Sequence, residues 1–213
     1  MNPRLKEYSL TDDVSLLPIL ERKIIVNQEV EVRRIELKSP PTNSAWSIAN
    51  AICGNSTPPM VTYTIEDAMK KRLQVPNFSK KLQYSEIYGT PDIITAEGDI
   101  MELKSTTKDS PSESTMCRGS VQSAIYGALK VMKDREKYGD IIHYPGLYLV
   151  VGYYKNSENL TAILNKMEIY AVNIKIKGLG LPNNVITLYK AEYLIQSLLR
   201  ARQEVRPAIP VLA

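Results

Sequence analysis

The sequence predicts an α/β fold, because segments with the period of strands alternate along the chain with segments with the period of helices. Two segments are distinctive. Gly146 to Tyr154 is a strongly apolar run that predicts a strand in the centre of a sheet, and Tyr189 to Val205 has the spacing of a final amphipathic helix. The length of 213 residues fits one domain, or one domain with an appendage.

The N-terminal residues 1–43 predict an arm that precedes a domain over residues 44–213. Within the arm, Leu16 to Arg22 has the pattern of a short helix. Glu29 to Lys38 alternates charged and apolar residues, which is the period of a half-exposed strand. We therefore expect a charged, solvated arm, which could contribute to a dimer interface.

The first part of the domain predicts two helices and a strand. Ser44 to Cys53 has helical spacing. Thr64-Ile65-Glu66-Asp67 resembles a capping box with Asp in the last place, which predicts a helix from Thr64 through about Leu73. Lys81 to Tyr88 reads as a strand that Gly89 ends.

The second part predicts two short strands, Asp92 to Ala96 and Asp99 to Ser105. Ser110-Pro111-Ser112-Glu113 then has the order of a helix start, with a cap, a proline and an acidic third residue. The helix carries an apolar stripe of Val121, Ile125, Ala128 and Met132. Ser157 to Lys166 predicts a further helix and Glu168 to Lys177 a strand.

The composition restricts the chemistry. The chain has 27 Lys and Arg against 23 Asp and Glu, a net charge of +4 that is compatible with nucleic acid without indicating it. A single histidine excludes paired-histidine zinc motifs, and two cysteines cannot supply the four ligands of a zinc site or an iron–sulfur cluster. Oxygen ligands must therefore hold any metal, which points to Mg²⁺ or Mn²⁺.

The sequence also indicates an intracellular, cytoplasmic protein. Its N-terminus has no apolar signal-peptide region, and no apolar run is long enough to span a membrane. Cys53 and Cys117 are expected to be free thiols of a reducing compartment, although a thermophilic source would favour a disulfide.

The most informative segment covers residues 89–104. A three-residue hairpin loop at 96–98, with Gly98 in the left-handed conformation, places Asp92 directly opposite Glu102. Lys104, two residues further, falls on the same face of the sheet. A two-residue loop would instead put the two carboxylates on opposite faces.

This constellation suits metal-assisted hydrolysis of a phosphodiester. Two neighbouring carboxylates repel each other, and a hard divalent cation relieves that repulsion. Lys104 beside the cation can hold or help to deprotonate a water molecule, and it offsets negative charge on a phosphate.

The segment resembles the signature of the PD-(D/E)XK nuclease superfamily, with Pro91-Asp92 followed ten positions later by Glu102-Leu103-Lys104. The resemblance implies a restriction-endonuclease-like core, a central mixed β-sheet flanked by helices. It also implies that Asp92 and Glu102 bind metal and that Lys104 assists the attacking water. An acidic residue on a preceding helix usually completes such a site. Glu66 is our choice, because Asp67 has a structural place in the expected capping box.

The next predicted helix adds a second resemblance. Gln122 and Tyr126 are similar to the Gln-x-x-x-Tyr motif of RecB-type nucleases, and Arg118 would extend their polar stripe beside the site. The RecB-like exonucleases of CRISPR adaptation carry four cysteines, so this chain is expected to have no iron–sulfur cluster. The order of the predicted elements, helix, hairpin, helix and strand, is similar to that of archaeal Holliday-junction resolvases. The size and the Lys/Ile/Tyr-rich composition are similar to those of nucleases of archaeal spindle-shaped viruses.

Other candidates have weaker support. Glu36-Leu37-Lys38-Ser39 echoes the residues from Glu102 to Ser105, but no Pro-Asp pair and hairpin precede it. His143 stands alone and reads as a surface or strand-start residue, and no Gly-x-Ser-x-Gly motif accompanies it. The arginines of the last helix read first as a solvated face, with DNA contact as the alternative: Arg200, Arg202 and Arg206.

The expected function is a DNA nuclease that uses Mg²⁺ or Mn²⁺ held by Glu66, Asp92 and Glu102, with water positioned by Lys104. A homodimeric endonuclease for branched DNA, in replication, repair or recombination, is the first expectation. A RecB-like single-strand exonuclease is the alternative within the class. A non-catalytic DNA-binding protein on the same fold is the alternative from another class.

Overall fold

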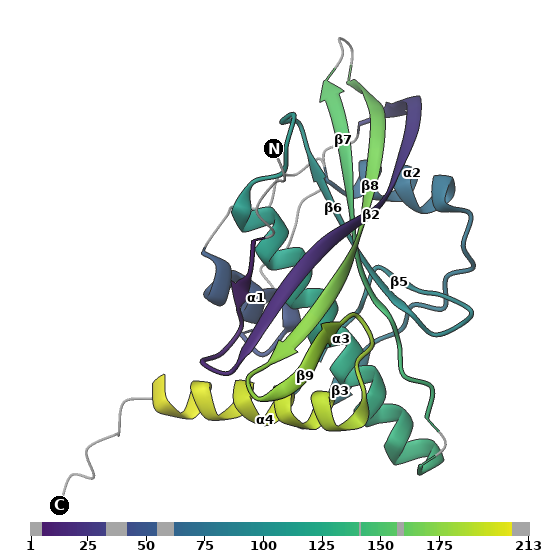
Figure 1. Cartoon of the computed structure of the whole chain (residues 1–213). Coiled ribbons are helices and arrows are strands. Elements are labelled where there is room, and N and C mark those ends of the chain that lie inside the picture. The colour runs from purple at the N-terminus through teal and green to yellow at the C-terminus, as the bar shows by residue number, and fades with distance from the viewer. Residues whose placement is uncertain (1–5, 33–41, 55–61, 141, 157–159, 206–213) are drawn as a thin grey trace, which may run out of the picture.

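The structure, a computed structural model, describes residues 6–32, 42–54, 62–140, 142–156 and 160–205. Its main element is a seven-stranded sheet (Figure 1). The strands of this sheet are β1 (Tyr8–Ser9), β2 (Val14–Glu31), β5 (Ile93–Ile94), β6 (Ile100–Thr106), β7 (Leu147–Asn156), β8 (Thr161–Ile176) and β9 (Leu179–Asn183). The four helices of the described residues are α1 (Ala45–Cys53), α2 (Thr62–Leu73), α3 (Glu113–Tyr138) and α4 (Leu188–Val205).

The sheet is mixed. Its order is β1-β2-β8-β7-β6-β5, with β9 pairing with β8, and β6 and β7 are parallel whereas the other pairs are antiparallel. The α/β class and a mixed central sheet flanked by helices are thus confirmed. The predicted central strand is also confirmed, because β7 lies between β6 and β8 and is buried on both faces from Leu149 to Tyr154.

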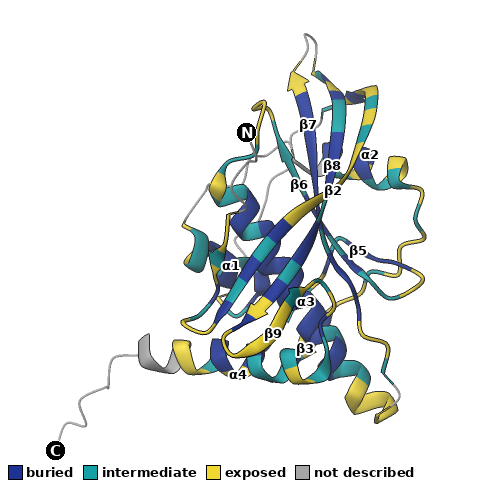
Figure 2. Cartoon of the chain, in the orientation of Figure 1, coloured by how far each residue is buried: buried dark blue, intermediate teal, exposed yellow. Residues whose placement is uncertain are grey.

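Two separate apolar cores lie on the two faces of the sheet. Buried residues of α1, α3 and α4 pack on one face, which we call the α3 face, and α2 packs on the other. Figure 1 shows α2 apart from the other three helices, and Figure 2 shows the buried stripes of α3 and the central strands. A side chain at Gly152 of β7 would meet Met69 of α2 at 2.4 Å, so α2 and the sheet are in close contact there.

The predicted N-terminal helix over Leu16 to Arg22 is wrong, because these residues lie within β2. Along β2, Val14, Leu16 and Pro18 are buried on one face and pair with β8. Proline has no backbone N–H to donate to a neighbouring strand. Pro18 is compatible with β2 because β1 pairs only with Ser15 and Leu16, so no strand on that side of Pro18 requires a hydrogen bond from it. The described part of the expected arm therefore belongs to the central sheet, whereas residues 33–38 lie outside the described residues.

Four further local predictions are wrong. The helix over Ser157 to Lys166 is absent, because Thr161 already begins β8 and residues 157–159 lie outside the described residues. Residues 81–88 form a hairpin of β3 (Leu82–Tyr84) and β4 (Ile87–Gly89) rather than one strand. The predicted capping box at Thr64 is absent because α2 already begins at Thr62. The cap of α3 is Ser112 rather than Ser110, and its side chain accepts from Thr115 N at 3.1 Å.

The two cysteines are not free thiols, so that prediction is wrong as well. Cys53 at the end of α1 and Cys117 in the second turn of α3 form a disulfide, with Cα atoms 5.7 Å apart. The other helical predictions are confirmed: residues 45–53 form α1, the apolar stripe of α3 is buried, and residues 189–205 are helical.

Candidate active site

The hairpin that carries Asp92 and Glu102 has the predicted register. β5 and β6 pair from Ile94 and Ile100 outward, so the antiparallel register places Asp92 opposite Glu102. Gly98 has a φ of 91°, the left-handed conformation expected of the last loop residue, and backbone hydrogen bonds close the three-residue loop. The two carboxylates therefore share one sheet face, as predicted.

Lys104 lies on the same face and contacts Glu102 directly. Its Nζ donates to Glu102 Oε1 at 2.6 Å and to the Leu103 carbonyl at 3.0 Å. Glu102 is 2% exposed, and its second oxygen, Oε2, has no hydrogen-bond partner among the described residues. Asp92 is half-buried, and its Oδ2 accepts from Leu103 N at 2.9 Å. The hairpin thus brings a buried ion pair and a second carboxylate together.

Glu66 reaches this group from α2. The strand β5 begins only at Ile93, so no described strand pairs with this edge of β6 from Glu102 onward. The charge of Glu66 acts on Glu102 and Lys104, and the charge of Asp92 acts on Glu66. The structure therefore brings all four predicted residues to one edge of the sheet.

The electrostatics of the site reflect three acids around one lysine. Burial, and then the charge of Asp92, raises the pKa of Glu66 to about 8. The same two causes hold the pKa of Glu102 well above its ordinary range, with Lys104 offsetting part of the effect. Burial alone would lower the pKa of Lys104, but the charges of Glu102, Asp92 and Glu66 outweigh it and raise that pKa. Full ionisation of the three acids would leave more negative charge than the lysine neutralises, and the raised pKa values of Glu66 and Glu102 reflect this repulsion.

Asn77 and Ser79 support β5, a role that was not predicted from the sequence. Asn77 Nδ2 donates to the Asp92 carbonyl at 3.0 Å, and Asn77 Oδ1 accepts from Ile94 N at 3.3 Å and Ser79 N at 2.8 Å. Ser79 Oγ also donates to the Pro91 carbonyl. These bonds hold the outer edge of β5 and so fix the backbone of Asp92. The bond between Asn77 and Ser79 is an Asx turn, a signal that Pro76-Asn77-Phe78-Ser79 carries in the sequence.

The predicted stripe on α3 is partly assembled. Gln122 Nε2 donates to Tyr126 Oη at 3.4 Å, and both residues are buried. A side chain at Gly89, three residues before Asp92, would meet the Tyr126 ring at 2.5 Å, so Tyr126 packs against the chain that enters the site. Arg118 is half-buried, its Nη1 has no hydrogen-bond partner among the described residues, and burial lowers its pKa.

The donor set fits a hard divalent cation in its chemistry. Within the described residues, no three carboxylate, imidazole or thiolate groups are gathered closely enough to ligate one cation. The site nevertheless offers oxygen donors only, with the buried Glu102 Oε2 lacking any partner and the acids in mutual repulsion. A cation would give the unpartnered oxygen a ligand and would offset the repulsion between the acids.

A second polar cluster was also missed. A network of hydrogen bonds and ion pairs on β2, β7 and β8 is centred on Glu168, whose partners are Tyr153, Tyr170, Lys166 and Lys23. An acidic residue between the apolar residues 167 and 169 was visible in the sequence, but only the pairing of three strands brings its partners together.

Other sequence candidates stay apart from the site or outside the described residues. The echo motif at 36–39 lies outside the described residues, as does Arg206, and the side chain of Arg202 is not described. His143 and Arg200 are exposed, as a surface reading predicts.

Comparisons of the chain with family models, with curated proteins and with solved structures find no match. None of the described helices is long and apolar enough to cross a bilayer.

Proposed function

We propose that the protein is a divalent-metal-dependent DNA nuclease with a restriction-endonuclease-like core of the PD-(D/E)XK type. The observation that carries the proposal is the hairpin register, which puts Asp92 and Glu102 on one face with Lys104 bonded to Glu102 at 2.6 Å. A buried carboxylate with one unsatisfied oxygen is costly for stability, and a functional role explains its retention.

Glu66, Asp92 and Glu102 are the residues that would hold Mg²⁺ or Mn²⁺. The bound ion would polarise the phosphodiester and stabilise the charge that develops during hydrolysis. Lys104 would hold the attacking water at its Nζ and offset negative charge on the phosphate. The Glu102 carboxylate would keep the ammonium in place, and Asn77 would keep the backbone of Asp92 in place.

Single substitutions test the site directly. We expect Asp92→Ala and Lys104→Ala to lose at least about a hundredfold in cleavage rate with Mn²⁺, because removal of one preorganised charged group costs that much or more. Glu97→Ala and Lys108→Ala remove the same charges from exposed positions nearby and should cleave as fast as the unchanged protein. Chelation with EDTA should abolish cleavage. Equal rates for Asp92→Ala, Lys104→Ala and their controls would contradict the site.

Glu66 has a matched neighbour for the same test. Glu66→Ala should lower the rate, whereas Asp67→Ala removes an exposed carboxylate one residue further along α2 and should not. The reverse result would assign the third acid to Asp67.

Within the class, we propose an endonuclease for branched DNA that acts as a homodimer, so that two sites reach two strands. The buried pair Gln122 and Tyr126 favours the second candidate, a single-strand exonuclease of the RecB type. A panel of junction, flap, duplex and single-strand DNA with Mn²⁺ separates the two, and a monomer in gel filtration would contradict the junction enzyme. Binding without cleavage of any substrate would support the non-catalytic alternative.

A further inference from the structure

The polar cluster around Glu168 lies on the same sheet face as Lys104. In the register of the sheet, Lys104 of β6 pairs with Val151 of β7, Val151 with Glu168 of β8, and Glu168 with Lys23 of β2. Neighbours in register share a face, so Glu168 lies two strands from Lys104, which is about 10 Å across the sheet.

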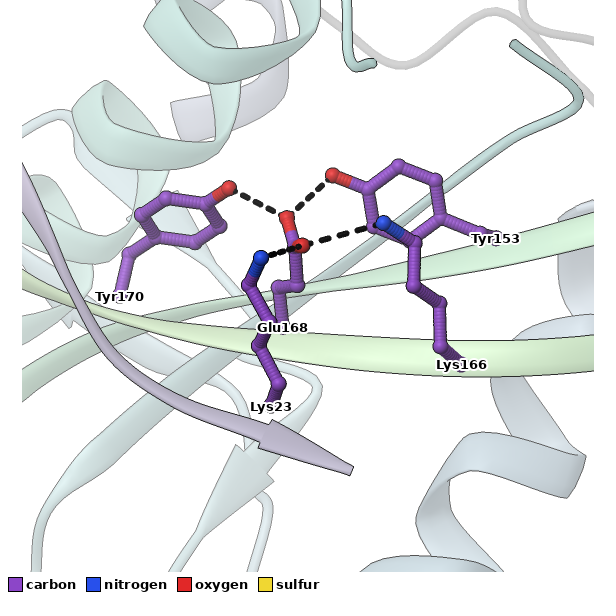
Figure 3. A network of polar contacts seen from close by, with 5 residues as sticks. All are labelled: Lys23, Tyr153, Lys166, Glu168 and Tyr170. Atoms are coloured by element: carbon purple, nitrogen blue, oxygen red, sulfur yellow. Dashed lines mark hydrogen bonds and ion pairs between the residues drawn. The ribbon is translucent and has the colours of Figure 1, made fainter. Parts of the chain in front are cut away.

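Every oxygen of Glu168 is occupied. Tyr170 Oη donates to Oε2 at 2.6 Å, and Tyr153 Oη donates to the same oxygen, whereas Lys166 Nζ contacts Oε1 at 3.1 Å and Lys23 Nζ at 3.4 Å (Figure 3). Lys166 Nζ also lies 3.9 Å from the centre of the Tyr153 ring. The carboxylate is thus a buried anchor that holds two ammonium groups in place.

The cluster has an excess of positive charge on its outer side. Glu168 is 5% exposed, whereas the side chains of Lys166 and Lys23 are 31% and 58% exposed. Two ammonium groups share one carboxylate, so one positive charge is left over at the surface. A fixed, partly exposed cation binds phosphate at a smaller entropic cost than a free lysine does.

The face is open next to the cluster, towards the far ends of the strands. The α3 helix begins at Glu113 and runs away from the far ends of β2, β7 and β8, where no described helix lies on the α3 face (Figure 1). Ile25, which pairs with Lys166, is 65% exposed. The register places Thr106 of β6, Tyr153 and Lys166 in one row, which leads from the end of β6 to the cluster.

We propose that Lys23 and Lys166, held by Glu168, bind the phosphate backbone of the DNA strand that enters the candidate active site. The inference rests on the proposed nuclease function and adds to it the path of the substrate across the sheet. A separation of about 10 Å corresponds to roughly three nucleotides at 3.4 Å per nucleotide of one strand. The contacts go to phosphates, so they hold DNA of any sequence.

Binding of fluorescein-labelled duplex DNA of mixed sequence, measured in EDTA across a series of salt concentrations, tests this inference. The Lys23→Ala/Lys166→Ala protein should bind several-fold more weakly, and its salt slope should fall by about 1.8, because each lost phosphate contact removes about 0.9. Lys175→Ala/Lys177→Ala is the matched control. It removes two exposed lysines, Lys175 on the opposite face near the end of β8 and Lys177 directly after the strand. Lys23→Arg/Lys166→Arg keeps both charges and should keep the slope.

Three results would overturn the inference: an unchanged slope in Lys23→Ala/Lys166→Ala, an equal loss in the control pair, or a change of oligomeric state in gel filtration without a change in DNA binding. The last result would make this face an interface between copies of the chain. Cleavage by the unchanged protein is measured separately with Mn²⁺. If the unchanged protein cleaves DNA but Lys23→Ala/Lys166→Ala leaves the salt slope of binding unchanged, only the proposed path of the strand is contradicted. A protein that cuts no DNA but shows the lysine-dependent slope contradicts only the nuclease.

Discussion

Two buried glutamates on one sheet face have opposite environments. Glu168 accepts hydrogen bonds from Tyr153, Tyr170 and Lys166 and forms an ion pair with Lys23. Although burial raises its pKa, the hydrogen bonds hold that pKa at about 2. Glu102 has one lysine partner and an oxygen without any, and burial with the charge of Asp92 raises its pKa. The first carboxylate is fully satisfied and serves as an anchor. The second is left able to bind another cation.

The satisfied glutamate predicts a dependence of stability on acid. The folded-state pKa of Glu168 lies below its ordinary value of 4.5, so its contribution is present above about pH 4.5 and is lost as the pH falls towards about 2. Glu168→Gln should therefore lower the free energy of unfolding at pH 7, by on the order of 3 kcal/mol. The difference between the two proteins should shrink by pH 3, as urea denaturation would measure.

Glu97→Gln is the control for this prediction, because Glu97 is exposed at the hairpin tip. A difference between Glu168→Gln and the unchanged protein that stays the same from pH 7 to pH 3 would show that the charge of Glu168 is not stabilised by the fold.

At the scale of elements, the disulfide joins two helices on one face. Cys53 ends α1, and Cys117 precedes Arg118 and lies about one turn before Gln122 on α3. The cross-link therefore holds the helix that carries the polar stripe against the helix next to it. Because 64 positions separate the two cysteines, the bond also removes much conformational entropy from the unfolded chain.

Removal of this bond should destabilise the protein by about 4 kcal/mol, the loop-closure value for a loop of this length. Cys53→Ser/Cys117→Ser should accordingly melt about 10 °C lower than the oxidised protein. Dithiothreitol should shift the unchanged protein towards the variant and leave the variant unaffected, as thermal unfolding would show. A thiol titration that finds two reactive cysteines in the unreduced, denatured protein would contradict the cross-link.

The elements that were predicted wrongly are those whose structure depends on partners far away in the chain. Leu16 to Arg22 fits a helix locally, yet it is a strand because β8 pairs with it more than 140 positions later. Residues 161–166 are likewise part of a long strand held between β7 and β2. Segments whose structure depends on local signals, such as the three-residue loop with Gly98 and the amphipathic stripe of α3, were predicted correctly.

At the scale of the whole molecule, different parts of the sheet carry the apolar cores, the candidate site and the proposed DNA contacts. Three helices cover one face and α2 covers part of the other, and the candidate site lies at the edge where β5 is short. That edge is the place where α2 can bring Glu66 to residues of the opposite face. The middle parts of β2 and β8 carry the lysines of the proposed strand path.

The sequence by itself determined the α/β class, the hairpin and the approach of Asp92, Glu102 and Lys104, because a strand period of two and a three-residue loop define a register without distant contacts. Only the tertiary structure decided that the arm is a strand of the sheet, that Cys53 and Cys117 are joined and that Glu168 has four partners. Lys166 and Glu168 have the same spacing as Glu102 and Lys104. Their different environments arise from which strands lie beside them, and that depends on the folding of the whole chain.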